Sequence, residues 1–560
     1  MHSTLSRWRQ RGSAAGKLLT IVLVLGLIGL GGWLVSKDML QKNAASPLGS
    51  LTSAVTSAAV PQPSEPVIGT PKLQSAAPYE MKNNIIDIDL SEYAGYGGLI
   101  VANGGLAPNP ESFFAKQYGF QVRLNKGESE EWSALNNGQM AGVATTADVL
   151  AVLGRQFEVT VPAQIAFSRG ADQVVVDSGI AGVNQLKGKT LAGTQFNESE
   201  FFIRYLASEA GVPVKVLRDL DSRPGPNELG LVFYEDAFVA CDAYAAELTG
   251  EQRLNGCVGW SPRTDQVVAE SAGAAKMLVS NRNLLVVADI LVLNKGFATA
   301  HPEVAKGLVH GLLEGNRQLR DNPQANAGVV AKAFGWTEAE TLEELSKVHL
   351  SNLPENLAFF DGSIDSAGSF QGIFQSSVLA YGALIKNPAD PARFADVQYL
   401  KALDGSGQFK GQSIAIAPIR TTGKVALEGD ALLSKDIRFF FEANSAVLDK
   451  QAKENQDYLD TIKKFLQVSP GSVVLLRGHV DNGMVADFER QGGSALVRSM
   501  ALKAMELSRE RAQAVKEALL SRHPGIKEDR IELVGRGWEE PLGQDGEQNR
   551  RVEVQWFTLE

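Results

Sequence analysis

The chain has 560 residues, of which 44% are hydrophobic and 21% charged, and its formal net charge is −10 at neutral pH. This length and composition predict about three globular domains, each large enough for its own core. The acidic balance argues against nucleic-acid binding, which needs a basic surface. The six histidines are scattered without a metal-ligand spacing, so the sequence predicts no metal site and no cofactor.

The first predicted element is an uncharged apolar run at residues 18–35, preceded by four basic residues and no acidic one. As a helix this run would nearly match the thickness of a bilayer core. The positive-inside rule then predicts a cytoplasmic N-terminus over residues 1–17 and a transmembrane helix over 18–36. A cleaved signal peptide is the alternative, but no small-x-small site directly follows the run. We therefore expect a single-pass inner-membrane protein with its bulk in the periplasm.

Two segments read as connections between domains. Residues 37–80 are rich in Ala, Ser, Thr and Pro, which predicts a flexible linker. Residues 391–430 carry Pro and Gly and mark a second connector.

Between these connections, residues 81–390 alternate short apolar strands with amphipathic helices, which predicts an α/β domain. Gly98–Asn103 reads as a buried strand that runs into two glycines. A second set of strands begins near Gln173, and the apolar run 284–293 leads the chain back toward the first set. This order predicts two lobes with a cleft between them.

The order of short motifs in this region resembles that of periplasmic solute-binding proteins of the nitrate, sulfonate and taurine type. The motifs are FFAKQYGF at 113–120, NGQ at 137–139, DQVVV at 172–176, LKGK at 186–189 and GWSP at 259–262. The resemblance implies a two-lobed domain, as in substrate-binding components of ABC transporters, with the ligand held between the lobes. The lining residues that it implies are Gly104, Gly105, Leu106, Thr145, Thr146, Ser168, Arg169, Thr194, Asn197, Trp260 and Ser261.

The charge of such a ligand is left open by the sequence. Free amides at helix starts favour anions, but residues 197–200 (NESE) read as a capping box with two glutamates in the first turn. A doubly charged anion would need Arg169 or Arg263, or the ligand carries little negative charge. Structural roles compete with binding at two of these positions: Trp260 as a core aromatic, and Arg169 as an ion-pair partner of Asp172.

The chain has two cysteines, Cys241 and Cys257, sixteen positions apart in the part predicted to be exported. A disulfide persists in such a compartment, but the spacing alone also allows two buried thiols.

The last region, residues 431–560, predicts a mixed α+β domain. Four of its motifs resemble the OmpA-like peptidoglycan-binding family: GHVD at 478–481, LSRERA at 507–512, GRGWEEP at 535–541 and NRRVE at 549–553. The resemblance implies that Asp481 and Arg511 bind the diaminopimelate of the wall peptide, with Arg551 as a further candidate. An ammonium suits a carboxylate, and a carboxylate suits the two-pronged guanidinium. An insertion before Arg511 is expected as a loop that could cover the site.

Together these features predict one transmembrane helix, an α/β two-lobed periplasmic-binding-protein-like domain and an α+β OmpA-like domain. We expect a non-catalytic envelope protein of a Gram-negative bacterium that binds peptidoglycan and a small solute, with anions among the candidates, and acts as receptor, sensor or tether. The alternative is a scaffold or stator-like subunit of a membrane complex whose solute-binding fold no longer binds solute.

Overall fold

The computed structural model describes residues 61–127, 132–282, 284–364, 368–416, 431–441, 445–449, 452–469, 472–543 and 546–557. The predicted N-terminal segment 1–17, the transmembrane helix 18–36 and the first part of the linker lie outside these residues. Among the helices that the structure does describe, none is both long and apolar enough to cross a membrane.

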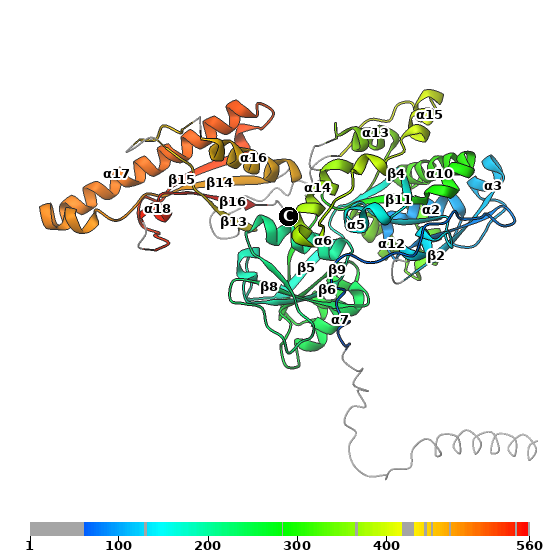
Figure 1. Ribbon diagram of the computed structural model, residues 1–560, viewed down its shortest axis with the longest axis horizontal. Helices are drawn as coiled ribbons and strands as arrows, with labels where there is room; N and C mark the ends of the chain where they lie inside the picture. Colours follow the sequence, from blue (N-terminus) through cyan, green and yellow to red (C-terminus); the bar gives the residue numbers. More distant parts are fainter. Residues whose placement is uncertain are drawn as a thin grey trace, which may run out of the picture. The chain divides into compact units, whose positions relative to one another are not determined.

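The first lobe of the central domain is built on a six-stranded mixed sheet with the order β12-β4-β11-β3-β1-β2. Figure 1 labels β4, β11 and β2 of this sheet. The strands are β1 (Ile85–Leu90), β2 (Gln121–Lys126), β3 (Gly142–Thr146), β4 (Val159–Ser168), β11 (Ala288–Asn294) and β12 (Val348–Leu350). Strand β1 pairs in parallel with β2 and β3, whereas β11 runs antiparallel to β3 and β4. Every residue of β4 and β11 is buried, as expected for strands covered on both faces.

Eleven helices of the described chain belong to this lobe or return to it. They are α2 (Gly97–Asn103), α3 (Phe113–Tyr118), α4 (Trp132–Asn136), α5 (Val149–Leu153), α9 (Lys295–Ala300), α10 (Pro302–Asp321), α11 (Pro323–Phe334), α12 (Glu338–Leu345), α13 (Leu353–Asp361), α14 (Phe370–Tyr381) and α15 (Gln398–Ser406).

The strand predicted at Gly98–Asn103 is wrong, because these residues form helix α2. Because the helix is buried, the segment has no polar face. In so short a run, the spacing of apolar residues does not distinguish a buried helix from a buried strand. Its glycines allow a close approach to α10: a Cβ on Gly98 would clash with Asn316, and one on Gly315 would clash with the Gly98 carbonyl. The helix ends at Gly104 in the left-handed conformation, with φ of 76°.

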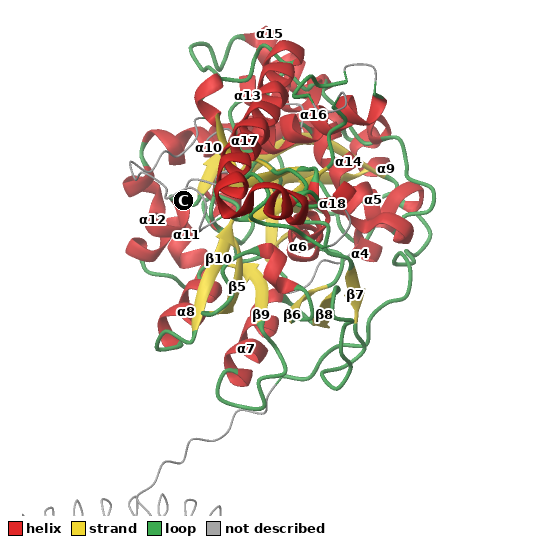
Figure 2. Ribbon diagram, turned by 90° about the vertical axis from the view of Figure 1, so that its left-hand side faces the viewer, coloured by secondary structure: helices red, strands yellow, loops and turns green. Residues whose placement is uncertain are grey.

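The second lobe has a six-stranded sheet with the order β10-β5-β9-β6-β8-β7, and Figure 2 shows these strands side by side. Its elements are β5 (Asp172–Asp177), β6 (Thr190–Thr194), β7 (Val214–Val216), β8 (Leu229–Tyr234), β9 (Gly256–Trp260) and β10 (Ala275–Ser280), with helices α6 (Glu198–Glu209), α7 (Ala237–Glu247) and α8 (Arg263–Glu270). The chain enters this lobe between β4 and β5 and leaves it between β10 and β11. At these crossings Asn281 accepts the Gly170 amide (2.7 Å) and donates its own amide to the Asp172 carbonyl (3.0 Å). The predicted two-lobed α/β domain is therefore present.

The part of the predicted linker that the structure describes lies on the surface of both lobes. We call residues 61–80 the strap. On the second lobe, Val67 exchanges two hydrogen bonds with the side chain of Gln195, at 2.8 and 3.0 Å. On the first lobe, the side chain of Gln156 accepts a hydrogen bond from the Leu73 amide of the strap, and the side chain of Asn294 accepts one from the Tyr79 amide. Backbone hydrogen bonds to two lobes hold this stretch in place despite its composition.

The first part of the predicted connector also packs on the first lobe. The Val161 amide of β4 donates to the Phe394 carbonyl (2.7 Å), and the Phe394 side chain is fully buried. Residues 391–416, which include α15, therefore belong to the central domain, and residues 417–430 lie outside the described chain.

The C-terminal domain has a four-stranded sheet with the order β13-β16-β14-β15. Its elements are β13 (Leu433–Ile437), β14 (Val473–Gly478), β15 (Ile531–Gly535) and β16 (Val552–Phe557), with helices α16 (Lys453–Val468), α17 (Val485–Arg522) and α18 (Gly546–Asn549). Trp556 of β16 stacks on Phe465 of α16 with a ring separation of 5.3 Å. The predicted α+β domain is present. The insertion expected as a loop is helical and part of α17, which breaks only at Gly492 and Gly493.

Candidate functional site

A cavity of about 210 Å³ lies between the two lobes of the central domain. Its walls come from the last residues of β1, β6 and β9, from the segments that follow β1, β2, β6 and β8, from part of β3, and from Pro71 of the strap. The carboxyl ends of parallel strands share one edge of a sheet, where α/β proteins commonly bind ligands. We call this space the interlobe cavity. The residues from the two lobes are Asp89, Leu90, Ser91, Gly127, Trp132, Val143, Ala144, Thr194, Gln195, Phe196, Asn197, Glu198, Glu235, Asp236 and Trp260.

A smaller space of about 20 Å³ adjoins the interlobe cavity, since Ser91, Glu198 and Trp260 line both. We call it the inner recess. Its other walls are Tyr93, Tyr96, Thr146, Asp172, Val287 and Asp289. The volume is sufficient for one water-sized group.

The described charged side chains that line these two spaces are all acidic. Asp89, Glu198, Glu235 and Asp236 line the interlobe cavity, and Asp172 and Asp289 line the inner recess with Glu198. Among the described residues that line either space there is no Lys, Arg or His.

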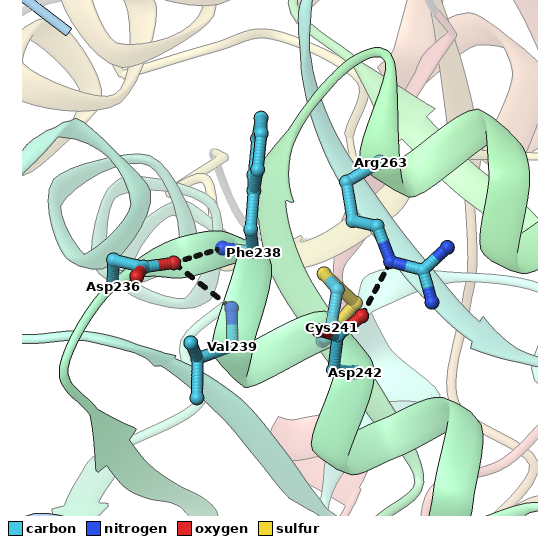
Figure 3. The surroundings of a disulfide bond; sticks show 7 residues. Asp236, Phe238, Val239, Cys241, Asp242 and Arg263 are labelled. Atoms are coloured by element: carbon cyan, nitrogen blue, oxygen red, sulfur yellow. Dashed lines mark hydrogen bonds and ion pairs between the residues drawn. A yellow bond between two sulfur atoms is a disulfide. The ribbon is translucent and has the colours of Figure 1, made fainter. Parts of the chain in front are cut away.

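The helix N-termini beside the cavity are already capped by the chain's own side chains. Asn197 accepts the amides of Ser199 and Glu200 at the start of α6. Glu200 in turn accepts the Phe196 amide at 2.6 Å, one residue before the position that a capping box requires. At the start of α7, Asp236 accepts the amides of Phe238 and Val239 at 2.7 and 2.9 Å (Figure 3). These amides are therefore not available to an anion.

The two arginines considered for an anionic ligand lie elsewhere. Arg169 is buried and its Nε donates to the Arg282 carbonyl at 2.6 Å. Arg263, at the start of α8, pairs with Asp242 of α7, as Figure 3 shows. Neither lines the interlobe cavity or the inner recess. The geometry thus favours the other alternative from the sequence, a ligand with little negative charge.

Burial of the acids changes their protonation. Burial raises the pKa of Asp172 to about 6 and that of Asp148, which is also buried, to about 7. Burial and the neighbouring charge of Asp172 raise the pKa of Asp289 well above its ordinary value. Carboxyl groups respond in this way where a buried negative charge has no nearby cation.

Four of the ligand-binding residues predicted from the sequence reach these spaces. Thr194, Asn197 and Trp260 line the interlobe cavity, and Thr146 lines the inner recess. The others lie outside both linings: Gly104, Gly105, Leu106, Thr145, Ser168, Arg169 and Ser261. Ser261, for example, is buried and donates to Glu344 at 2.5 Å.

Gly104, Gly105 and Leu106 were predicted to line the cavity because helix α2 was taken for the strand that leads into it. The strand that leads into the cavity is β1, and its last two residues, Asp89 and Leu90, line the cavity together with Ser91, which follows it. The signal was the alternation of IIDIDL, in which every second residue is buried.

The two cysteines are joined in the structure. Cys241 of α7 and Cys257 of β9 form a disulfide with an S–S distance of 2.14 Å (Figure 3). The bond ties α7 to the strand that ends at Trp260. Both elements contribute to the same wall of the interlobe cavity, through Asp236 and Trp260.

In the C-terminal domain, Asp481 and Arg511 have different surroundings. Asp481 is 29% exposed, accepts the Gly483 amide and lies 3.4 Å from Arg550. Arg511 is buried, donates through Nε to the Ser445 carbonyl at 3.1 Å, and stacks over the Phe441 ring at 5.2 Å. Burial and the nearby charge of Arg550 lower the pKa of Arg511. Arg550, which the sequence did not single out, is thus a neighbour of the predicted site.

Arg551 has a structural environment. Its side chain is 5% exposed, and its Nε donates to Asp436 of β13 at 3.1 Å. The nearby His479, Glu540 and Glu553 offer atoms within 4.8 Å of one another, a spacing that a cation could use. Arg477 already pairs with both glutamates, at 2.7 and 3.1 Å, so this cluster is an ion-pair network.

These observations define the class of the chain's two folded parts: a two-lobed α/β domain and an α+β domain. The second part is similar to a known family, since residues 440–555 match the OmpA family. Comparison of the whole chain with curated proteins gives no match.

Solved structures similar to the central part include three bacterial binding proteins. The periplasmic aliphatic sulphonate-binding protein of Escherichia coli is 14% identical, with 57% of this chain and 97% of that chain covered and a TM-score of 0.42. A putative periplasmic sulfonate-binding protein of Methylobacillus flagellatus is 14% identical, with coverage of 60% and 97% and a TM-score of 0.43. The periplasmic nitrate-binding protein of Synechocystis is 12% identical, with coverage of 58% and 89% and a TM-score of 0.41.

Proposed function

We propose that this chain is an envelope protein that binds peptidoglycan through its C-terminal domain and a small solute in the interlobe cavity. In this proposal the predicted N-terminal helix anchors it in the inner membrane, and it acts in the periplasm as a receptor, sensor or tether. No catalytic step is included.

The observation that carries the proposal is the match of residues 440–555 to the OmpA family, with Asp481 and Arg511 in the corresponding motifs. The Nε of Arg511 is already bonded to Ser445, and the ring of Phe441 supports the guanidinium plane. A guanidinium held in this way offers its remaining N–H groups to a carboxylate in a fixed plane. Asp481, which is partly exposed, offers a carboxylate to an ammonium.

Solute binding is supported by the cavity itself. It lies between two lobes at the carboxyl ends of strands, and aromatic and polar side chains line it. Its volume of about 210 Å³ is below the roughly 300–1,000 Å³ of pockets for drug-sized molecules, which fits a small solute.

Cosedimentation of the full chain with purified sacculi tests the wall-binding part. We expect binding to sacculi that contain diaminopimelate, and weaker binding by about tenfold or more for Arg511→Lys and Asp481→Asn. Lysine cannot reproduce the two-pronged geometry of the guanidinium, and asparagine lacks the negative charge of the carboxylate. Arg522→Lys is the matched control, since this exposed arginine pairs with Asp460. Equal binding by Arg511→Lys and the unaltered chain would contradict the proposed site.

A further inference from the structure

Acidic and aromatic side chains line the interlobe cavity and the inner recess, so a ligand in these spaces would lie among carboxyl groups and aromatic rings. Glu198 and Trp260 line both spaces, and Trp132 lines the larger one. No Lys, Arg or His occurs among the described lining residues, so every charged side chain in these walls is acidic.

A buried, incompletely bonded carboxylate points to a ligand independently of this charge. Asp289 lies in the inner recess and is 2% exposed. Tyr93 and Tyr96 lie close to its carboxylate, yet Oδ2 has no hydrogen-bond partner within the described chain. A buried acceptor without a partner is costly, and such a group in a native structure calls for an explanation such as an ion or ligand.

Trp260 gives a third indication. Its Nε1–H group is buried and has no hydrogen-bond partner within the described chain, and its side chain lines both spaces. An indole N–H requires an acceptor, and the indole ring attracts cations.

We propose that the interlobe cavity binds a small organic cation, with its ammonium group in the inner recess between Glu198 and Asp289 and its body against Trp260. This inference rests on the proposed solute-binding function and assigns the charge of the solute. The recess, at about 20 Å³, has room for one water-sized group, the size of an ammonium. A hydroxyl or carbonyl on the same molecule would satisfy the Trp260 N–H.

A metal ion is the other source of positive charge. Calcium prefers six to eight oxygen ligands and magnesium an octahedral set, usually with several waters. The recess has room for about one water-sized group beside its aromatic walls, which is too little for the full set of oxygen ligands around either metal ion. The geometry therefore favours the organic cation.

Calorimetric titration of the full chain tests the inference. The cationic probes are ethanolamine, putrescine and agmatine, each of which carries a primary ammonium group. The comparison probes are propan-1-ol, which is a neutral isostere of ethanolamine, together with ethanesulfonate, nitrate, Ca²⁺ and Mg²⁺. We expect saturable binding of at least one organic cation. If ethanolamine is that ligand, its isostere binds more weakly by about tenfold or more.

Two isosteric variants locate the charge. Glu198→Gln and Asp289→Asn are each expected to weaken cation binding by about tenfold or more, because each removes one carboxyl group that would pair with the bound cation, without changing the shape of the side chain. Glu111→Gln is the control, since this exposed acid pairs with Lys116 away from the cavity. Retained binding to sacculi shows that the C-terminal domain of each variant is intact, and unchanged circular dichroism shows that the central domain is folded.

The outcomes separate this inference from the proposed function. Binding of ethanesulfonate or nitrate without any cation overturns the inference and retains solute binding. Binding of Ca²⁺ or Mg²⁺ alone, or cation binding that neither isosteric variant weakens, also overturns it. Failure of every probe overturns both the inference and the solute-binding part of the proposed function.

Discussion

Replacement of Glu553 by glutamine would remove the carboxylate at the centre of a buried network in the C-terminal domain. Glu553 lies 3.1 Å from Arg477 and 3.5 Å from His479, accepts a hydrogen bond from Gln555, and is 11% exposed. Burial by itself would raise the pKa of Glu553, but the adjacent His479 ring and the charge of Arg477 outweigh burial and lower the pKa to about 2.

The size of the effect follows from linkage. A decrease from the ordinary value of 4.5 to about 2, at about 1.4 kcal/mol per unit of pKa, corresponds to about 3 kcal/mol of stability. Since the folded-state pKa is lowered, this stability is present above pH 4.5 and is lost as the pH falls toward 2. We expect Glu553→Gln to be less stable than the unaltered chain by about 3 kcal/mol at pH 7, and the difference to shrink below pH 4.5.

Urea titrations of the full chain at pH 7, 4 and 2.5 measure this difference. Hydrogen exchange of the β14 and β16 amides identifies the unfolding of this domain. Glu532→Gln is the matched control, because Glu532 is exposed on the neighbouring strand β15. A loss below about 1 kcal/mol at pH 7, or an equal loss at all three pH values, would refute the linkage argument.

The remaining predictions concern the central domain. Glu200→Ala leaves Arg204, which is 7% exposed, without its carboxylate at 2.7 Å, and we expect urea denaturation to show a loss of about 3–5 kcal/mol; a loss below about 1 kcal/mol would contradict this. Replacement of Cys241 and Cys257 by serine opens a sixteen-residue loop and is expected to cost about 3 kcal/mol, seen as a lower urea midpoint; an unchanged midpoint would count against it. Gln195→Ala removes both hydrogen bonds to Val67, and we expect faster hydrogen exchange in the strap with unchanged exchange in α6. Equal exchange of the strap in both proteins would show that its other contacts hold it.

The order of elements was predictable from the sequence because it depends on local patterns. The C-terminal domain is the clearest case, where motifs of several consecutive residues, such as those around Asp481 and Arg511, identified the family that residues 440–555 match. In the central domain, the alternation of strands and amphipathic helices was sufficient to predict two α/β lobes, because helix and strand periodicities differ.

The candidate ligand site was predicted only in part. Thr194 and Trp260 lie at the ends of strands that were recognised, Asn197 follows the first of these strands, and all three line the interlobe cavity. Gly104 and its neighbours were wrongly placed at a strand end, because a short apolar run does not reveal whether it is a buried helix or a buried strand.

What the sequence by itself determined is therefore the domain order, the α/β and α+β classes and the likeness to the OmpA family, because each of these depends on residues that are close together in the sequence. Only the tertiary structure brought Asp89, Asp172, Glu198 and Asp289 together from both lobes and placed no basic residue among the described lining. The charge of a binding site depends on residues far apart in the chain. For this reason the charge of the ligand could not be predicted from the sequence, whereas the folded structure predicts a cation.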